Sequence, residues 1–312
     1  MNLLVGALAM GLLLSLATLG VFVSFRILRV IDLTVEGAFG VGAAVAATAL
    51  VRGAPPTVAT GVGAAGGVLA GLATGLLHTR LRIDALLAGI LTSTALYSVM
   101  LYVMGGGERS IVARETLFSG AERIWHRAGA GDITVFGTTV AAGSWASLAL
   151  LLLVVPAVAS AVAWFFRTHL GLALRAAGDN PRMARAQGVD IGRMTVLGVA
   201  IANGLVGLSG ALFSQYQGFA SVEMALGTFV GAVGCLVLGQ ALSGRERLGA
   251  ELTGAIAGTV LFRVLIAAAL RAGLDPNMLK LTTAGFVIVV LVLQSRVRHT
   301  VVRPGRATGD AG

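Results

Sequence analysis

Six long stretches of this 312-residue chain contain no charged side chain, and this feature limits the possible fold more than any other. A helix needs about 20 apolar residues to cross the core of a bilayer, and each stretch reaches that length. The stretches are Leu3–Phe25, Gly53–Leu77, Ala85–Gly107, Ile133–Phe166, Met194–Val222 and Met224–Gly244. Strands of a membrane barrel would instead alternate apolar and polar residues over about ten positions. The chain is therefore predicted to be an all-α, polytopic membrane protein.

Three less regular stretches complete the predicted set of membrane spans. They are Gly37–Val51, Leu252–Leu270 and Leu281–Ser295. The first is short and begins just after Asp32 and Glu36, and the second contains Arg263. The sequence thus predicts about nine transmembrane helices, or eight if the short stretch re-enters the membrane.

Composition supports this class of protein. Hydrophobic residues make up 56% of the chain and charged residues only 12%, whereas soluble domains carry about a quarter charged residues. A soluble enzyme is therefore excluded. A single cysteine, Cys235, excludes an internal disulfide framework.

The arginines indicate the orientation in the membrane. With nine helices and the N-terminus outside, fifteen arginines fall in the inner segments and six in the outer ones. Since inner loops carry the excess of basic residues, the N-terminus is predicted outside and the C-terminus in the cytoplasm. The net charge of +9 is then mainly a signal of topology. Nucleic acid is not an expected partner, because the arginines are scattered over separate loops without interleaved aromatic residues.

Short motifs recur at a constant offset of 187 residues. Thr34-Val35-Glu36 matches Ser221-Val222-Glu223, and the glycines of segment 67–71 match those of segment 254–258. The offset predicts a 4+1+4 inverted repeat: repeat 1 about 1–107, connector helix about 140–166, cytoplasmic loop 167–193, and repeat 2 about 194–295. Inverted repeats are typical of transporters, with the substrate path at their interface. Gly67, Gly71 and Gly75 form a stripe that predicts close helix packing rather than ligand contact.

The chain lacks the usual motifs of catalysis and metal binding. Its four histidines have no second ligand at metal-binding spacing. Its single lysine, Lys280, follows a leucine, so a phosphate-binding GxxxxGK loop is impossible. The sequence predicts no enzymatic activity, no metal and no cofactor.

Polar residues near the predicted membrane interior are candidates for a substrate path, because such residues are costly there. The candidates are Asp32, Thr34, Glu36, Asn203, Gln215, Glu223 and Arg263. Glu36 and Glu223 could equally stabilise the first turns of helices, and Asn203 and Gln215 could bond a neighbouring helix. The alternative for Arg263 is an ion pair with Glu251 or Glu36.

The longest polar segment, residues 167–193, is predicted to hold a short cytoplasmic helix. Asn180 is a helix-capping residue, and Pro181 suits the first helical position, so a helix is expected over Arg182–Gln187. The alternative is a solvated basic inner loop.

This segment resembles the coupling loop of bacterial ABC importer permeases of the branched-chain amino acid and ribose type. The residues that carry the resemblance are Arg175, Gly178, Asp179, Asn180, Pro181, Ala184, Gln187 and Gly188. Asp32–Phe39 is similar to a segment of one subgroup, whose members are sometimes assigned to tryptophan or tyrosine. The resemblance spans residues 7 to 295.

The resemblance implies a permease in the bacterial inner membrane that forms a dimer with a second copy. It further implies two cytoplasmic ATPase subunits that bind the short helix, and an extracytoplasmic solute-binding protein. The transported molecule would be a small solute such as an amino acid, carried by alternating access. Two other functions stay open from the residues: a secondary transporter with a relay of Arg263, Glu36 and Glu223, and a membrane scaffold that binds a partner through residues 167–193.

Overall fold

The computed structural model describes residues 2–127, 129, 131–135, 138–243, 248–275, 278, 281–290 and 292. Within them, eight helical segments are long and apolar enough to cross a membrane, and Leu281–Val290 forms a shorter apolar helix. The prediction of an all-α polytopic protein is confirmed. Lys280 and most of the segment 291–295 lie outside the described residues.

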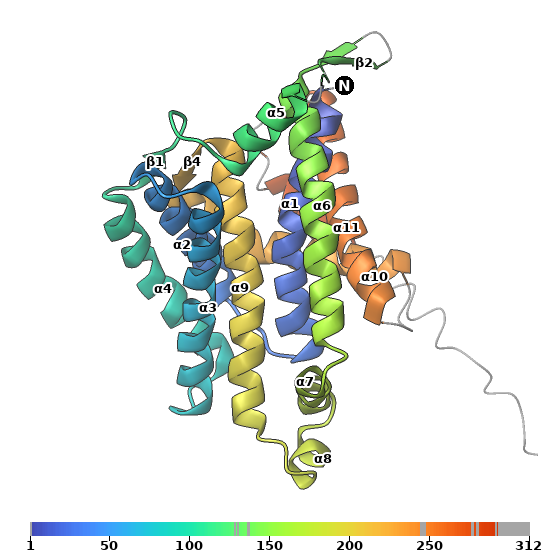
Figure 1. Ribbon diagram of the computed structural model, residues 1–312. Coiled ribbons are helices and arrows are strands. Elements are labelled where there is room, and N and C mark those ends of the chain that lie inside the picture. Colours follow the sequence, from blue (N-terminus) through green and yellow to red (C-terminus); the bar gives the residue numbers. More distant parts are fainter. Residues whose placement is uncertain are drawn as a thin grey trace, which may run out of the picture.

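The long helices follow one another with short connections (Figure 1). They are α1 (Asn2–Val21), continued by the π-helix η1 (Phe22–Ile27), α2 (Thr34–Val51), α3 (Pro56–Thr79), α4 (Ala85–Met104), α6 (Ala142–Phe165), α9 (Ile191–Gln217), α10 (Thr228–Ser243) and α11 (Leu248–Arg271). The short helices are α5 (Leu117–Arg127), α7 (His169–Asp179), α8 (Pro181–Ala186) and the 3-10 turn η2 (Val222–Ala225). Short antiparallel ladders join β1 (Glu108–Ser110) to β4 (Phe219–Ser221) and β2 (Ile133–Val135) to β3 (Thr138–Val140).

Two helices are shorter than the uncharged stretches predict. The stretch Ile133–Phe166 begins with the β2–β3 hairpin, and α6 starts only at Ala142. The stretch Met194–Val222 continues past the end of α9, where Gly218 has a left-handed φ of 81°. In both places the connecting segment outside the helix also lacks charge, so charge alone does not mark the helix end.

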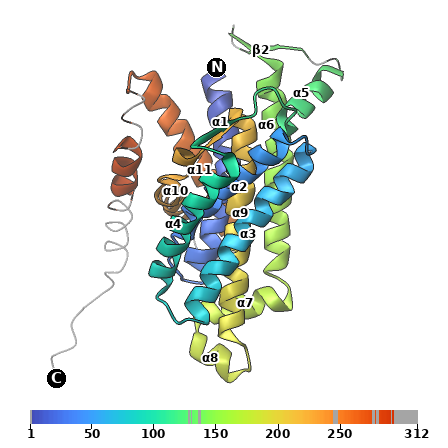
Figure 2. The same ribbon diagram turned by 90° about the vertical axis from the view of Figure 1, so that its left-hand side faces the viewer.

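The two ends of the helix bundle differ in their short elements. The N-terminus, α5 and the β2–β3 hairpin lie at one end, and α7 and α8 lie at the opposite end (Figures 1 and 2). The predicted orientation, with the N-terminus outside, therefore places α7 and α8 on the cytoplasmic side.

Close packing of small residues holds α3 against α9. A Cβ added at Gly67 or Gly71 would collide with the backbone of α9, at the carbonyl oxygens of Asn203 and Val199 respectively. A Cβ at Gly75 would lie 2.9 Å from the Cα atom of Val196. The predicted packing role of this glycine stripe is confirmed, since small residues let membrane helices approach closely.

The packing of the two predicted repeats is reciprocal. The repeat assignment pairs α1 with α9, α2 with α10, and α3 with α11. In the structure α9 packs on α2 and α3, whereas α1 packs on α11 and α10. The first helix of each predicted repeat thus lies against the second and third helices of the other.

Candidate functional site

A cavity of about 370 Å³ lies where α1, α2, α9, α10 and α11 meet, and it reaches the short helix Leu281–Val290. Its lining is mostly apolar and includes Phe39, Phe213, Met224, Phe262 and Ile266. The polar side chains that line it are Thr18, Thr228, Thr259, Thr283, Cys235 and Arg263. Ligand pockets commonly hold about 300–1,000 Å³ and combine apolar walls with a few polar groups, so this cavity is a candidate binding site.

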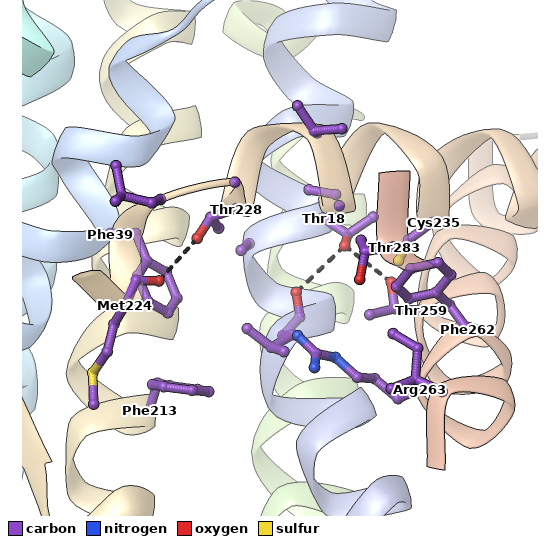
Figure 3. Close-up of a pocket in the computed structure, with 18 of the residues that line it drawn as sticks. Thr18, Phe39, Phe213, Met224, Thr228, Cys235, Thr259, Phe262, Arg263 and Thr283 are labelled. Atoms are coloured by element: carbon purple, nitrogen blue, oxygen red, sulfur yellow. Dashed lines mark hydrogen bonds between the residues drawn. The ribbon is translucent and has the colours of Figure 1, made fainter. Parts of the chain in front are cut away.

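The side chains around the cavity are divided by chemistry, as Figure 3 shows. Phe39, Phe213 and Met224 lie on one side, on α2, α9 and η2. Phe262 and Arg263 lie on the other side, on α11, and the side chain of Arg263 extends from α11 toward α1. The cavity therefore has an aromatic wall and a wall that carries a positive charge.

Hydroxyl groups join α1 to α11 beside Arg263. The hydroxyl of Thr259 donates to that of Thr18 at 2.9 Å, and Thr259 also bonds the carbonyl oxygen of Ala255 within its own helix. Both threonine side chains are buried. Polar contacts between helices of this kind add to membrane helix association.

Arg263 has neither of the partners that the sequence suggested. Glu251 accepts a hydrogen bond from Nη2 of Arg26 at 2.9 Å, and Glu36 accepts one from the backbone N–H of Gly227 at 3.0 Å. Among the described residues Arg263 forms no ion pair and no hydrogen bond. The alternative of an ion pair with Glu251 or Glu36 is not found: Glu251 meets Arg26, and Glu36 meets the N–H of Gly227.

Glu36 connects the beginnings of two helices. It lies in the first turn of α2, and the N–H group that it binds, that of Gly227, immediately precedes α10. A carboxylate near the first turn of a helix interacts favourably with the helix dipole. Glu36 thus stabilises the beginning of α10 from a neighbouring helix, next to the cavity wall formed by Gly227 and Thr228.

Asp32, Thr34 and Asn203 form a buried polar cluster away from the cavity lining. Asp32 accepts hydrogen bonds from the N–H of Thr34 at 2.9 Å and from Nδ2 of Asn203 at 2.6 Å. The hydroxyls of Thr34 and Thr74 lie 2.6 Å apart. Burial raises the pKa of Asp32 above its ordinary value, and the hydrogen bonds from Thr34 and Asn203 partly offset that increase. The cluster ties α2 to α3 and α9.

The remaining two candidates also lie apart from the cavity. Gln215 donates to the hydroxyl of Thr60 at 2.8 Å and accepts from the N–H of Leu117 at 3.0 Å, so it joins α9 to α3 and to α5. Glu223 is exposed in η2, and its N–H donates to the hydroxyl of Ser221. Neither residue lines the cavity described above.

At the opposite end, α7 and α8 form a short helical unit in which α7 is partly buried and α8 is mostly exposed. Asn180 caps α8 by accepting a hydrogen bond from the N–H of Met183 at 3.1 Å, and Pro181 occupies the first position. Gly188, with φ of 83°, follows the end of the helix. The helix spans Pro181–Ala186, one residue earlier than predicted. Its inner residue Ala184 is buried, and its other residues are exposed.

The end of α7 contacts the end of η1 and the residues that follow it. Asp179 forms an ion pair with Arg29 at 2.8 Å. Gly178 lies so close to the carbonyl oxygen of Ile27 that a Cβ would collide with it. Arg175 is partly buried on the same helix, whereas Gln187 and Gly188 are exposed. The contact at Gly178 could not be predicted from the sequence, because it depends on η1 ending against α7.

Metal binding has no support in the described residues, which contain no group of three His, Cys, Asp or Glu side chains able to hold an ion. Reasoning from the sequence also missed most of the cavity lining. Thr18, Phe39 and Phe213 are ordinary membrane-helix residues, and only their positions in space distinguish them.

A family model and two relatives that this chain matches are all transport permeases. The chain matches the family described as branched-chain amino acid transport system / permease component over residues 3–293. It is 32% identical over 288 residues to the tyrosine transport system permease protein of Clostridioides difficile, covering 92% of this chain and 90% of that protein. It is 30% identical over 244 residues to the autoinducer 2 import system permease protein of Klebsiella pneumoniae, covering 77% and 64% of the two chains.

A solved structure shares the fold. It shows an inward-facing conformation of an ABC transporter assigned to the metal-chelate type, with a TM-score of 0.51 and 16% identity. The match covers 94% of this chain and 86% of that one. The chain therefore belongs to the branched-chain amino acid transport system / permease component family, as an ABC importer permease that spans the bacterial inner membrane several times.

Proposed function

We propose that this permease carries an amino acid with an aromatic side chain, tyrosine first, into the cytoplasm by alternating access. The observation that supports this most directly is the cavity of about 370 Å³ with Phe39 and Phe213 on its wall. The relative from Clostridioides difficile carries tyrosine transport in its name. The cavity volume lies in the range for small-molecule sites.

We further propose that the chain works as a dimer with a second copy, with two ATPase subunits on the cytoplasmic side and a binding protein outside. In this assembly the permease itself carries out no chemical reaction and needs no metal or cofactor. ATP hydrolysis belongs to the partner subunits, since the sequence lacks a GxxxxGK loop.

The proposed ATPase-binding region is the α7–α8 unit, with Arg175, Gly178, Asp179, Asn180, Pro181, Ala184, Gln187 and Gly188. Four described contacts support a mechanical connection from it to the helices around the cavity. Asp179 and Gly178 hold α7 against Arg29 and Ile27, at and just after the end of η1, which continues α1. A few residues further, Asp32 is bonded to Asn203 of α9 and to the beginning of α2. Movement of α7 would therefore be transmitted to α1, α2 and α9 together.

The proposed substrate path includes the seven polar candidates in different roles. Arg263 faces the cavity, and Glu36 supports the wall at Gly227. Asp32, Thr34, Asn203 and Gln215 position the helices around the path. Glu223 is exposed at the predicted outer side, where solute would enter.

The test combines uptake with co-purification. The full-length permease is reconstituted with its ATPase and binding protein, and ATP-dependent uptake of labelled L-tyrosine is measured. The variant Arg182→Glu/Arg185→Glu reverses two exposed charges on α8 without touching the Arg29–Asp179 pair. We expect it to lose both the co-purified ATPase and uptake.

A matched charge reversal at the opposite end, Arg127→Glu on exposed α5, should leave the ATPase bound. Uptake that follows a proton gradient without ATP, or an ATPase that binds the α8 variant as well as wild type, would contradict the proposed mechanism.

A further inference from the structure

The cavity contains a positive charge that no carboxylate among the described residues pairs with. Arg263 is the one charged side chain among the described residues that line it. It lies in α11, eight residues before the helix ends at Arg271, or about 12 Å along the helix at 1.5 Å per residue. A guanidinium group at such depth is costly, and it normally pairs with another group or marks a functional site.

The carboxylates of the neighbouring helices have other partners. Glu251, on α11 itself, is held by Arg26, and Glu36, on α2, is held by the N–H of Gly227. Asp32 is held by Asn203 and Thr34, outside the cavity lining. Across the part of the chain that the structure describes, the guanidinium thus faces an open space of about 370 Å³ that an anionic group can enter.

The other wall of the cavity suits an apolar group. The rings of Phe39 and Phe213 pack with centroids 5.5 Å apart, and Met224 lies beside them in Figure 3. Arg263 extends from the opposite wall toward α1 in the same view. A ligand that fills this space would place an anionic group at α11 and an apolar group at α2 and α9.

We propose that Arg263 binds the carboxylate of the transported solute, while the side chain of the solute packs against Phe39 and Phe213. This inference rests on the proposed import function and names the chemical group that the permease recognises. Arginine suits the role because its planar guanidinium can donate two parallel hydrogen bonds to a carboxylate. The hydroxyls of Thr18 and Thr259, which lie between α1 and α11, complete the polar side of the site.

A thiol reporter next to Arg263 tests whether the cavity attracts anions. Ile266 lines the cavity one helical turn beyond Arg263, so the reporter is Ile266→Cys in a Cys235→Ser background. Modification of the full-length permease in nanodiscs is timed with anionic 2-sulfonatoethyl methanethiosulfonate and with the cationic 2-(trimethylammonio)ethyl analogue. The measured quantity is the ratio of the two rates.

Arg263→Gln should lower the anionic-to-cationic ratio at least about fivefold, because a nearby unit charge acts in opposite directions on the two reagents. Arg263→Lys should keep the ratio within about twofold of the starting protein, since the charge remains. Arg271→Gln removes an exposed arginine from the end of the same helix and should leave the ratio unchanged. If the ratio of anionic to cationic modification rates in the Arg263→Gln protein equals that of the starting protein, the proposal is overturned.

Protection of the same thiol identifies the recognised group. L-tyrosine should slow modification, whereas tyramine, which lacks only the carboxylate, should not. Arg263→Gln should abolish the protection by L-tyrosine, and Arg263→Lys should retain part of it. Equal protection by the two compounds, or no protection by either L-tyrosine or L-leucine, would overturn the proposal.

Failure of this inference is distinguishable from failure of the proposed function. If Arg263→Gln takes up L-tyrosine as fast as wild type, the import function stands and the carboxylate site is wrong. If L-leucine protects through Arg263 and L-tyrosine does not, the carboxylate site stands and the preference for an aromatic solute is wrong.

Discussion

Two ionisable side chains in the interior of this protein, Asp32 and Arg263, have opposite surroundings. Asp32 accepts hydrogen bonds from Thr34 and Asn203 and is 1% exposed. Arg263 lines an open cavity and has no described partner of opposite charge. A buried group that is fully bonded fixes the positions of helices, whereas a charge without a partner is available to a ligand. The sequence alone placed both residues in one class of candidates, and the comparison separates their roles.

The largest expected effect on stability comes from substitution of Asp32, the fully bonded carboxylate. Asp32→Ala removes the acceptor for the N–H of Thr34 and for Nδ2 of Asn203, so we expect a loss of about 3 kcal/mol in the free energy of unfolding. Thermal or denaturant unfolding of the purified protein measures this loss. Asp84 is a matched control, because it makes the same bond to a backbone N–H two residues later at 2.9 Å but is exposed.

Asp84→Ala should cost only about 1 kcal/mol, the usual value for a helix cap. Equal losses in the two variants would show that the bond to Asn203 contributes nothing, and the contrast between Asp32 and Arg263 would then fail.

Substitution of Arg263 is expected to raise the free energy of unfolding, whereas substitution of Asp32 lowers it. Arg263→Leu removes an uncompensated charge from the membrane interior, so stability should increase by up to about 2 kcal/mol while uptake is lost. Unfolding curves and uptake assays on the same preparation measure the two effects. Arg271→Leu, at the exposed end of α11, is the control for a simple gain in hydrophobicity. A marked loss of stability in Arg263→Leu would mean that the guanidinium has a structural partner.

Glu36 shares one property with each of these two residues. It is hydrogen-bonded, as Asp32 is, and it lies next to the cavity that Arg263 lines. Glu36→Ala leaves the N–H of Gly227 without its acceptor, and the expected cost is about 1 kcal/mol. Hydrogen exchange should become faster at the beginning of α10 and stay unchanged at the beginning of α3. Glu36→Gln keeps an oxygen acceptor and should restore most of the protection; faster exchange in both variants alike would indicate a role for the charge itself.

The pH dependence of stability sharpens the assignment of Asp32. Because burial raises the pKa of Asp32 in the folded protein, the folded state binds its proton more tightly than the unfolded state. Its contribution to stability is therefore complete below the ordinary value of 3.8 and decreases as the pH rises through the folded-state pKa. Asp32→Asn should remove that decrease from the curve of unfolding free energy against pH. Parallel curves for the two proteins would contradict this account.

The smallest effect on stability is expected at the exposed ion pair. Arg29 and Asp179 are both largely exposed, so Arg29→Gln should cost less than about 1 kcal/mol. Uptake per ATP hydrolysed should nevertheless decrease, because the pair connects α7 to the segment that follows η1. Arg193→Gln breaks another exposed pair, with Asp190, and serves as the control. An unchanged ratio of uptake to hydrolysis in Arg29→Gln would exclude this pair from the connection.

Sequence reasoning succeeded where local chemistry determines structure. The uncharged stretches predicted the membrane spans, Asn180 and Pro181 predicted the start of α8, and the spacing of Gly67, Gly71 and Gly75 predicted close packing. The uncharged stretches did not predict where α6 begins or where α9 ends, because an uncharged segment precedes α6 and another follows α9. It also failed to find the cavity, because Phe39 and Phe213 lie far apart in the chain and resemble the residues around them.

The sequence by itself determined that this chain spans a membrane with helices. Only helices and closed barrels satisfy the backbone in lipid, and its long uncharged stretches lack the alternation of barrel strands. It also predicted that Asn180 and Pro181 begin α8. Only the tertiary structure decided which carboxylate each arginine meets, because Arg26 and Glu251 are 225 residues apart in sequence. The fold pairs Glu251 with Arg26 and Glu36 with the N–H of Gly227. Neither carboxylate therefore pairs with Arg263, which faces the cavity.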